Sequence, residues 1–205
     1  MSDHPWLIAA FERLNIPGTL CAQIIAHHSE PHRHYHTLRH IELMLRQIPS
    51  DHAFTAEMLA ATLFHDIIYD PTRSDNEEQS LALFQSVSDR LAPPQPIDTG
   101  LISAMIAATR SHHFRDQRSS EDEAVNLLLK ADLSILWHDD RAVYAWYADG
   151  VRKEYAFVPE DRFREARVKI LTGLCHDLLH SQQLTTAQAM MLESNIGWEL
   201  GLLHP

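Results

Sequence analysis

The sequence is poor in the residues that hold small, loop-rich or secreted folds together. Its two cysteines, Cys21 and Cys175, lie far apart and form no CxxC pair, so they provide no disulfide framework. Such sparse cysteine usage is typical of a reducing compartment, and we expect buried free thiols in a cytoplasmic protein. Only six glycines occur in 205 residues, which leaves few positions for tight hairpins and favours helices.

Long apolar runs and an excess of positive charge are also missing. No apolar stretch approaches the ~18 residues of a membrane-spanning helix, and residues 1–5 lack the basic and apolar parts of a signal sequence. Lys and Arg number 17 against 28 Asp and Glu, a formal charge of −11. We therefore expect neither a membrane nor duplex nucleic acid as a partner. An anionic substrate stays open, because a bound cation can invert the local potential of a site.

Helical periodicity runs along most of the chain. Apolar residues recur at i, i+3 or i+4, and i+7 within segments that polar or proline-containing turns separate. This pattern predicts an all-α, single-domain helical bundle, since a chain of this length can bury one core without disulfides. The predicted helices cover residues 4–14, 19–28, 35–48, 54–69, 76–91, 97–110, 123–136, 141–155, 159–180 and 185–202.

The most unusual stretch is residues 63–70, where His65 and Asp66 interrupt an apolar segment and Asp70 follows one helical turn later. Burying an ionised carboxylate is costly unless a cation or a hydrogen-bond network compensates its charge. The neighbouring imidazole makes a divalent metal the obvious cation. A hydrogen-bonded core histidine is the alternative.

Further ligand candidates lie in three other predicted helices. His36 and His40 are four residues apart and would share a helical face, although a hydrogen-bonded surface or core pair has the same spacing. Asp132 stands among apolar neighbours, where an N-cap or an ion pair with Lys130 is the alternative to metal binding. His112 follows a helix end, where the helix dipole stabilises a protonated imidazole whatever its role.

Two nitrogens and two carboxylates from His40, His65, Asp66 and Asp132 form a set that suits Mn, Fe, Co, Ni or Zn, with Mg as a further option. Between about residues 33 and 136 the chain resembles the HD-domain superfamily of metal-dependent phosphohydrolases, in particular its small bacterial members. The resemblance rests on three segments: Tyr35-His36-Thr37-Leu38-x-His40, His65-Asp66-Ile67-Ile68-Tyr69-Asp70-Pro71 and Asn76-Glu77-Glu78.

The resemblance implies a helical bundle in which the helices of 139–202 pack on a motif-bearing core at 33–136. It implies that His40, His65, Asp66 and Asp132 ligate the metal, and that His112 contributes to a second ion. His36 falls where related cyclic-nucleotide phosphodiesterases have a proton-donating histidine. Members that cleave nucleoside monophosphates typically carry a Glu at the position of Tyr69. The resemblance therefore leaves that role to Asp70, Glu77 or Glu78.

These features predict hydrolysis of a small phosphorylated, nucleotide-like metabolite by a metal-activated water. His36 would transfer the proton, with Asp70 or Glu77 as second choices. The acids at 77 and 78 have a structural alternative, because Ser74 or Asp75 with either Glu would form a helix capping box. Arg73, Arg110 and Lys130 are the basic residues near the motifs that could bind phosphate. A non-catalytic, metal-containing regulatory module is the alternative function, and a metal-dependent oxygenase is a more distant one.

Overall fold

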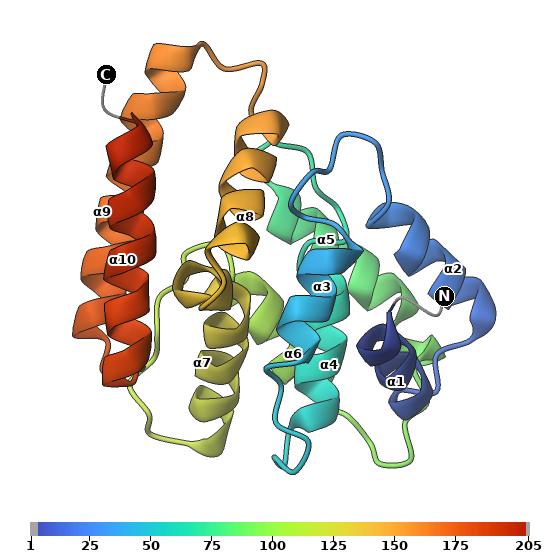
Figure 1. The fold of residues 1–205 in the computed structure, drawn as a ribbon. Coiled ribbons are helices and arrows are strands. Elements are labelled where there is room, and N and C mark those ends of the chain that lie inside the picture. Colours follow the sequence, from blue (N-terminus) through green and yellow to red (C-terminus); the bar gives the residue numbers. More distant parts are fainter. Residues whose placement is uncertain (1–3, 204–205) are drawn as a thin grey trace. The chain divides into compact units, whose positions relative to one another are not determined.

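The computed structural model describes residues 4–203, and within that range the chain forms ten α-helices, two short 3-10 helices and no strand (Figure 1). The predicted all-α fold is thus confirmed. The chain divides into two compact units, of which the first ends at Asp132 and the second begins at Leu133. The prediction that the helices of 139–202 pack on the motif-bearing core within one domain stays a prediction.

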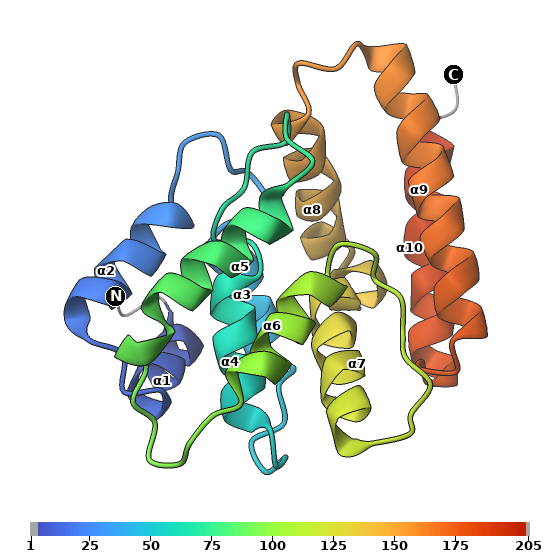
Figure 2. The same cartoon turned by 180° about the vertical axis from the view of Figure 1, so that it is seen from behind.

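The first unit is built around helix α4. Its elements are α1 (Pro5–Arg13), α2 (Gly18–His27), α3 (Leu38–Leu45), α4 (Thr55–Phe64), α5 (Asn76–Val87), η1 (Ser88–Arg90), α6 (Thr99–Ala108) and α7 (Ser120–Asp132). Helix α4 packs against α1, α3, α5, α6 and α7, and Figures 1 and 2 show it among them from opposite sides. Nine of its ten residues are buried, as expected for a helix that is apolar on every side.

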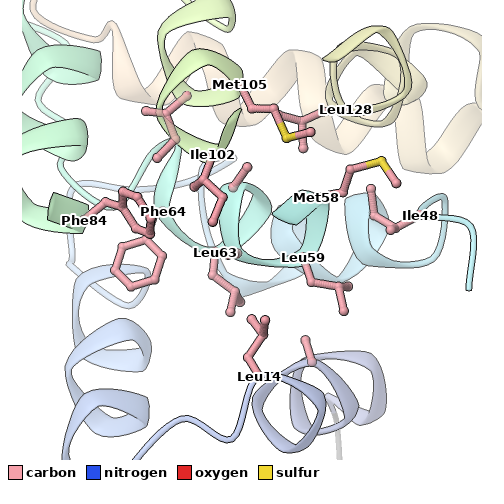
Figure 3. Close-up of a cluster of buried hydrophobic side chains, with 14 of the residues drawn as sticks. Leu14, Ile48, Met58, Leu59, Leu63, Phe64, Phe84, Ile102, Met105 and Leu128 are labelled. Atoms are coloured by element: carbon pink, nitrogen blue, oxygen red, sulfur yellow. The ribbon is translucent and has the colours of Figure 1, made fainter. Parts of the chain in front are cut away.

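The core of the first unit fixes the C-terminal half of α4. Leu63 and Phe64 are fully buried, and Ile102 of α6 and Phe84 of α5 lie in the same cluster (Figure 3). The rings of Phe64 and Phe84 meet edge to face with centroids 5.4 Å apart, a favoured aromatic geometry. The residues that directly follow Phe64 are therefore held deep in the unit.

The predicted helix 54–69 is wrong at its C-terminal end. Helix α4 stops at Phe64, and residues 65–70 continue as turns. Asp66 and Asp70 are therefore not one helical turn apart on a shared face. Beyond the end of the helix, side chains from other segments bind the carbonyl oxygens of residues 66–70.

The predicted helix 35–48 is wrong at its N-terminal end. Helix α3 begins at Leu38, and Thr37 is extended with φ −108° and ψ −179°. His36 thus lies before the helix, and the i, i+4 argument does not place it beside His40. The predicted helix 123–136 likewise ends earlier, at Asp132, and the chain continues as a 3-10 helix.

The second unit contains η2 (Leu133–Trp137), α8 (Arg141–Glu154), α9 (Glu160–His180) and α10 (Thr186–Leu203). Helices α9 and α10 lie side by side in both views. At their contact, the buried Glu199 carboxylate accepts hydrogen bonds from Arg167 Nε at 2.7 Å and from Tyr144 Oη at 2.6 Å. A fully bonded buried carboxylate of this kind links α8, α9 and α10.

Two negative predictions can be compared with the described residues. In residues 4–203, no helix combines the length and the apolarity that crossing a membrane requires. Cys21 and Cys175 are both free, as predicted, but each is half-buried rather than buried.

Candidate metal centre

Three predicted ligands converge in the first unit. His40 comes from α3, His65 follows α4 and Asp132 is the last residue of α7, and one ligand atom from each lies within 4.8 Å of the others. His40 Nε2 is 3.4 Å from His65 Nε2 and 3.3 Å from Asp132 Oδ1. Ligand bonds of about 2.0–2.2 Å in tetrahedral geometry place ligand atoms roughly 3.3–3.6 Å apart. His65 Nε2 is 3.8 Å from Asp132 Oδ1, so these residues could hold a divalent ion if this pair closes by a few tenths of an ångström.

Asp66 lies at the edge of this three-residue group. Its Oδ2 is 3.1 Å from His65 Nε2 and 4.0 Å from His40 Nε2. Its side chain is largely buried, with 17% of its surface exposed. The structure therefore brings together all four residues that are predicted to ligate one metal ion. Of the other ligands, His65 lies closest to Asp66.

The electrostatics of the centre favour positive charge between the carboxylates. Burial lowers the pKa of His40. Burial acts the same way on His65, but the Asp66 carboxylate outweighs it and raises the pKa of His65 to about 9. Burial by itself would raise the pKa of both carboxyl groups. Nevertheless, the pKa of Asp66 is lowered by His65, and that of Asp132 by its hydrogen bond to His112.

The orientation of His65 is set by the end of α4. Its Nδ1 lies 3.0 Å from the carbonyl oxygen of Thr62, which can only accept, so the ring carries its proton on Nδ1. Nε2 faces Asp66, His40 and Asp132, and with the raised pKa of His65 it also carries a proton, which a bound metal ion would displace. In metal sites, the ring nitrogen that does not bind the metal commonly donates its N–H to a backbone carbonyl in this way.

Side chains from other segments bind the carbonyl oxygens between residues 63 and 70. The pairs are Leu63 with His28, Asp66 and Ile67 with Arg33, Ile68 with Ser80, Tyr69 with His32, and Asp70 with Asn76. The bond to Leu63 competes with the helical bond from Ile67 N, and the other bonds satisfy carbonyl oxygens that have no helical partner. Sequence reasoning missed the roles of His28, His32, Arg33 and Ser80, because partners this distant in sequence leave no periodic signal.

His36 lies at the rim of the centre. Its Nε2 is 3.8 Å from Asp66 Oδ2, and its side chain is 21% exposed. Its ring stacks on Tyr69, with centroids 4.1 Å apart and an interplanar angle of 28°. His36, which the resemblance to the HD-domain superfamily implies as proton donor, thus lies next to a candidate ligand and is partly open to solvent.

His112 contacts the other oxygen of Asp132. Its Nε2 lies 2.9 Å from Asp132 Oδ2, whereas Oδ1 of the same carboxylate faces His40. His112 adopts φ 52°, the left-handed region that costs a non-glycine residue about 1–2 kcal/mol. Buried Asn126 holds the following loop by accepting from Arg115 N and donating to Arg115 O. A role for His112 at a second ion stays a prediction.

Asp70 and Glu77 are not joined to the centre. Asp70 Oδ1 accepts hydrogen bonds from the N–H and hydroxyl of Thr72, and these bonds lower the pKa of Asp70. The side chain of half-buried Glu77 has no hydrogen bond or ion pair with any residue between 4 and 203. Their catalytic roles stay predictions. The predicted capping box is wrong, because the side chain of Asp75, the N-cap of α5, binds Arg73 and Gln79 instead.

The three candidate phosphate-binding residues differ in what they contact. Arg73 pairs with Asp75, and Arg110 pairs with Glu78. The side chain of Lys130 forms no hydrogen bond or ion pair within the described part of the chain, so Asp132 is not its partner. The suggested Lys130–Asp132 pair is therefore wrong.

A scan against protein-family models, a search of curated proteins and a search of solved structures each find no match to this chain. Membership of the HD-domain superfamily thus stays a prediction that rests on the motif residues.

Proposed function

We propose that this protein is a metal-dependent phosphohydrolase of the HD-domain type, acting on a small phosphorylated, nucleotide-like metabolite. The observation that carries the proposal is the convergence of His40, His65 and Asp132 within 4.8 Å, with Asp66 beside them. Two imidazoles and two carboxylates suit a divalent transition metal such as Mn, Fe, Co, Ni or Zn, and Mg less well. The two free cysteines accord with a cytoplasmic setting.

The residues around the centre supply the rest of the chemistry. When bound, a divalent ion provides hydroxide from water near neutral pH and offsets charge on the phosphoryl oxygens. His36 is within reach of Asp66 and exposed at the rim, so it can hold the proton that the leaving oxygen receives. Such proton transfer contributes roughly 10²–10⁴-fold to the rate. Tyr69 stacks on His36, which holds the ring plane while the proton moves.

One observation favours a second candidate function, a metal-containing regulatory module without turnover. Two of the three basic residues near the motifs, Arg73 and Arg110, are already paired with carboxylates. A phosphate group would have to displace those carboxylates or bind through Lys130 alone. In such a module, chelation lowers thermal stability while no phosphoester is cleaved.

The test begins with metal content, measured by plasma mass spectrometry on protein purified without chelator. We expect near-stoichiometric transition metal in the wild type and little in His65→Ala or Asp66→Ala. His113→Ala is the matched control, because His113 is exposed and, among residues 4–203, its side chain hydrogen-bonds only the carbonyl of Ser111. Folded wild type that takes up no metal under any loading condition contradicts the proposal.

The same samples are then incubated with phosphomonoesters, cyclic nucleotides and dinucleotides, with and without Mn²⁺. Hydrolysis that His65→Ala and Asp66→Ala lose and His113→Ala keeps supports the phosphohydrolase and identifies the substrate class. Full metal content without hydrolysis of any of these esters favours the regulatory module.

A further inference from the structure

Arg33 is a deeply buried charged group outside the metal centre, and sequence reasoning gave it no role. Its side chain has 0% exposure, and its guanidinium forms four hydrogen bonds. Nε donates to Glu30 Oε2 at 3.0 Å, Nη1 to the carbonyls of His36 at 3.1 Å and Asp66 at 2.7 Å, and Nη2 to the carbonyl of Ile67 at 2.9 Å.

These bonds join two segments that lie more than 30 residues apart in sequence. One segment carries His36, the candidate proton donor, and the other carries Asp66, a candidate ligand. A single nitrogen, Nη1, bonds the carbonyl oxygens of both residues. One guanidinium nitrogen therefore ties the backbone at His36 to the backbone at Asp66.

The same guanidinium also contacts the ring that orients His36. Arg33 Cζ lies 5.4 Å from the centroid of the Tyr69 ring, and that ring stacks on His36 at 4.1 Å. Arg33 thus acts on the position of His36 through its carbonyl oxygen and through the neighbouring aromatic ring.

This arrangement requires the planar, forked geometry of arginine. Lysine carries the same charge as a single point and cannot present two rows of N–H groups to separate carbonyl oxygens at fixed angles. An apolar residue at this position would leave these three carbonyl oxygens and the Glu30 carboxylate without their donor. The four bonds point to a requirement for geometry.

We propose that Arg33 is a positioning residue that sets the spacing between His36 and Asp66, whose Nε2 and Oδ2 atoms lie 3.8 Å apart. Its consequence for catalysis rests on the proposed function, but its effect on the spacing does not. Arg33 itself donates to backbone carbonyls and to Glu30, and to none of the candidate ligand side chains.

The first measurement is metal affinity in the folded full-length chain. Arg33→Lys, which keeps the charge, and Arg33→Ala should each weaken metal binding by roughly 10–100-fold, as substitutions behind metal ligands typically do. Leu91→Ala is the control, since it truncates a buried leucine of the same unit that lies after η1. It should lower stability and leave the metal affinity of folded protein within about twofold.

The second measurement needs no metal and no activity. A nuclear Overhauser effect between the ring protons of His36 and Tyr69 reports their stacking in metal-free protein. We expect it in the wild type and in Leu91→Ala, and we expect its loss in Arg33→Lys.

The two measurements separate the possible failures. A wild type that binds no metal contradicts the proposed function, and the ring contact still decides the role of Arg33. If Arg33→Lys keeps both the ring contact and the wild-type metal affinity, the positioning role is wrong. If Arg33→Ala does not fold, Arg33→Lys alone gives the answer.

Discussion

His112 Nε2 lies 2.9 Å from Asp132 Oδ2, while Oδ1 of the same carboxylate lies 3.3 Å from His40 Nε2. The two carboxylate oxygens of Asp132 therefore contact two different histidines, His112 and His40. We expect Asp132→Asn to weaken binding of the first ion by about 100-fold or more, because it removes one charged ligand. His112→Asn should keep the first ion and lose any second equivalent, since asparagine tolerates the left-handed backbone of this position.

Isothermal titration with Mn²⁺ measures both effects. His113→Asn is the control for a histidine lost from the same loop. Loss of the first equivalent in His112→Asn would show that His112 belongs to the first site.

Buried His28 predicts a pH dependence of stability. It is 1% exposed, it bonds the carbonyl of Leu63, and burial lowers its pKa to about 3. The unfolded chain takes up this proton near pH 6.5, whereas the folded chain resists it. The contribution to stability is therefore complete above pH 6.5 and declines on acidification toward pH 3. Between these two pH values, the free energy of unfolding falls by up to about 1.4 kcal/mol for each pH unit of acidification.

Urea unfolding between pH 7.5 and 4.5 tests this prediction by comparing the wild type with His28→Gln, whose amide can still donate to Leu63. In the variant, the free energy of unfolding should depend less steeply on pH, by up to about 1.4 kcal/mol per pH unit. His27→Gln, a change at the neighbouring and less buried histidine, should keep it. Equal slopes in all three proteins would contradict the assignment.

Asn126 should hold the loop that carries His112. It is buried and makes two hydrogen bonds to the backbone of Arg115, at 2.8 and 2.9 Å. Asn126→Ala leaves both backbone groups without this partner, and we expect a loss of about 1–3 kcal/mol in the free energy of unfolding. The Arg115 amide should also exchange its hydrogen faster.

Asn126→Asp is the matched variant. Its carboxylate can still accept from Arg115 N but cannot donate to Arg115 O, so protection of the amide should be largely retained while stability falls. Unchanged exchange at Arg115 in Asn126→Ala would show that other contacts hold the loop.

Glu199 and Arg167 form the buried ion pair of the second unit, with each side chain 7% exposed. Arg167→Met leaves the Glu199 carboxylate buried with only Tyr144 as a partner. We expect a loss of about 3–5 kcal/mol, the usual cost of breaking a buried pair from one side. Arg162→Met on the same helix breaks an exposed pair with Glu165 and should cost at most about 1 kcal/mol.

Chemical unfolding of the full chain compares these two variants. The double variant Arg167→Met/Glu199→Leu should recover much of the stability, because it removes the unpaired charge as well. Equal stabilities of Arg167→Met and Arg162→Met would contradict this account.

The sequence by itself determined the all-α class and the ligand candidates. Helical periodicity is local, so apolar spacing within ten to twenty residues is enough to recognise most helices. His65, Asp66 and Asp132 were recognisable because ionisable groups in apolar segments need compensation. His40, His65 and Asp132 do meet, as that reasoning required.

Only the tertiary structure decided where α3 and α4 end and how the centre is supported. Helix α4 stops at Phe64, where His28 binds the carbonyl of Leu63, and beyond it His32, Arg33, Ser80 and Asn76 bind the carbonyls of residues 66–70. His36 reaches the centre from a turn rather than from a shared helical face. Several of these partners lie more than 30 residues from the groups they bind. Spacing along the chain carries no record of such contacts, because they exist only once the helices have packed.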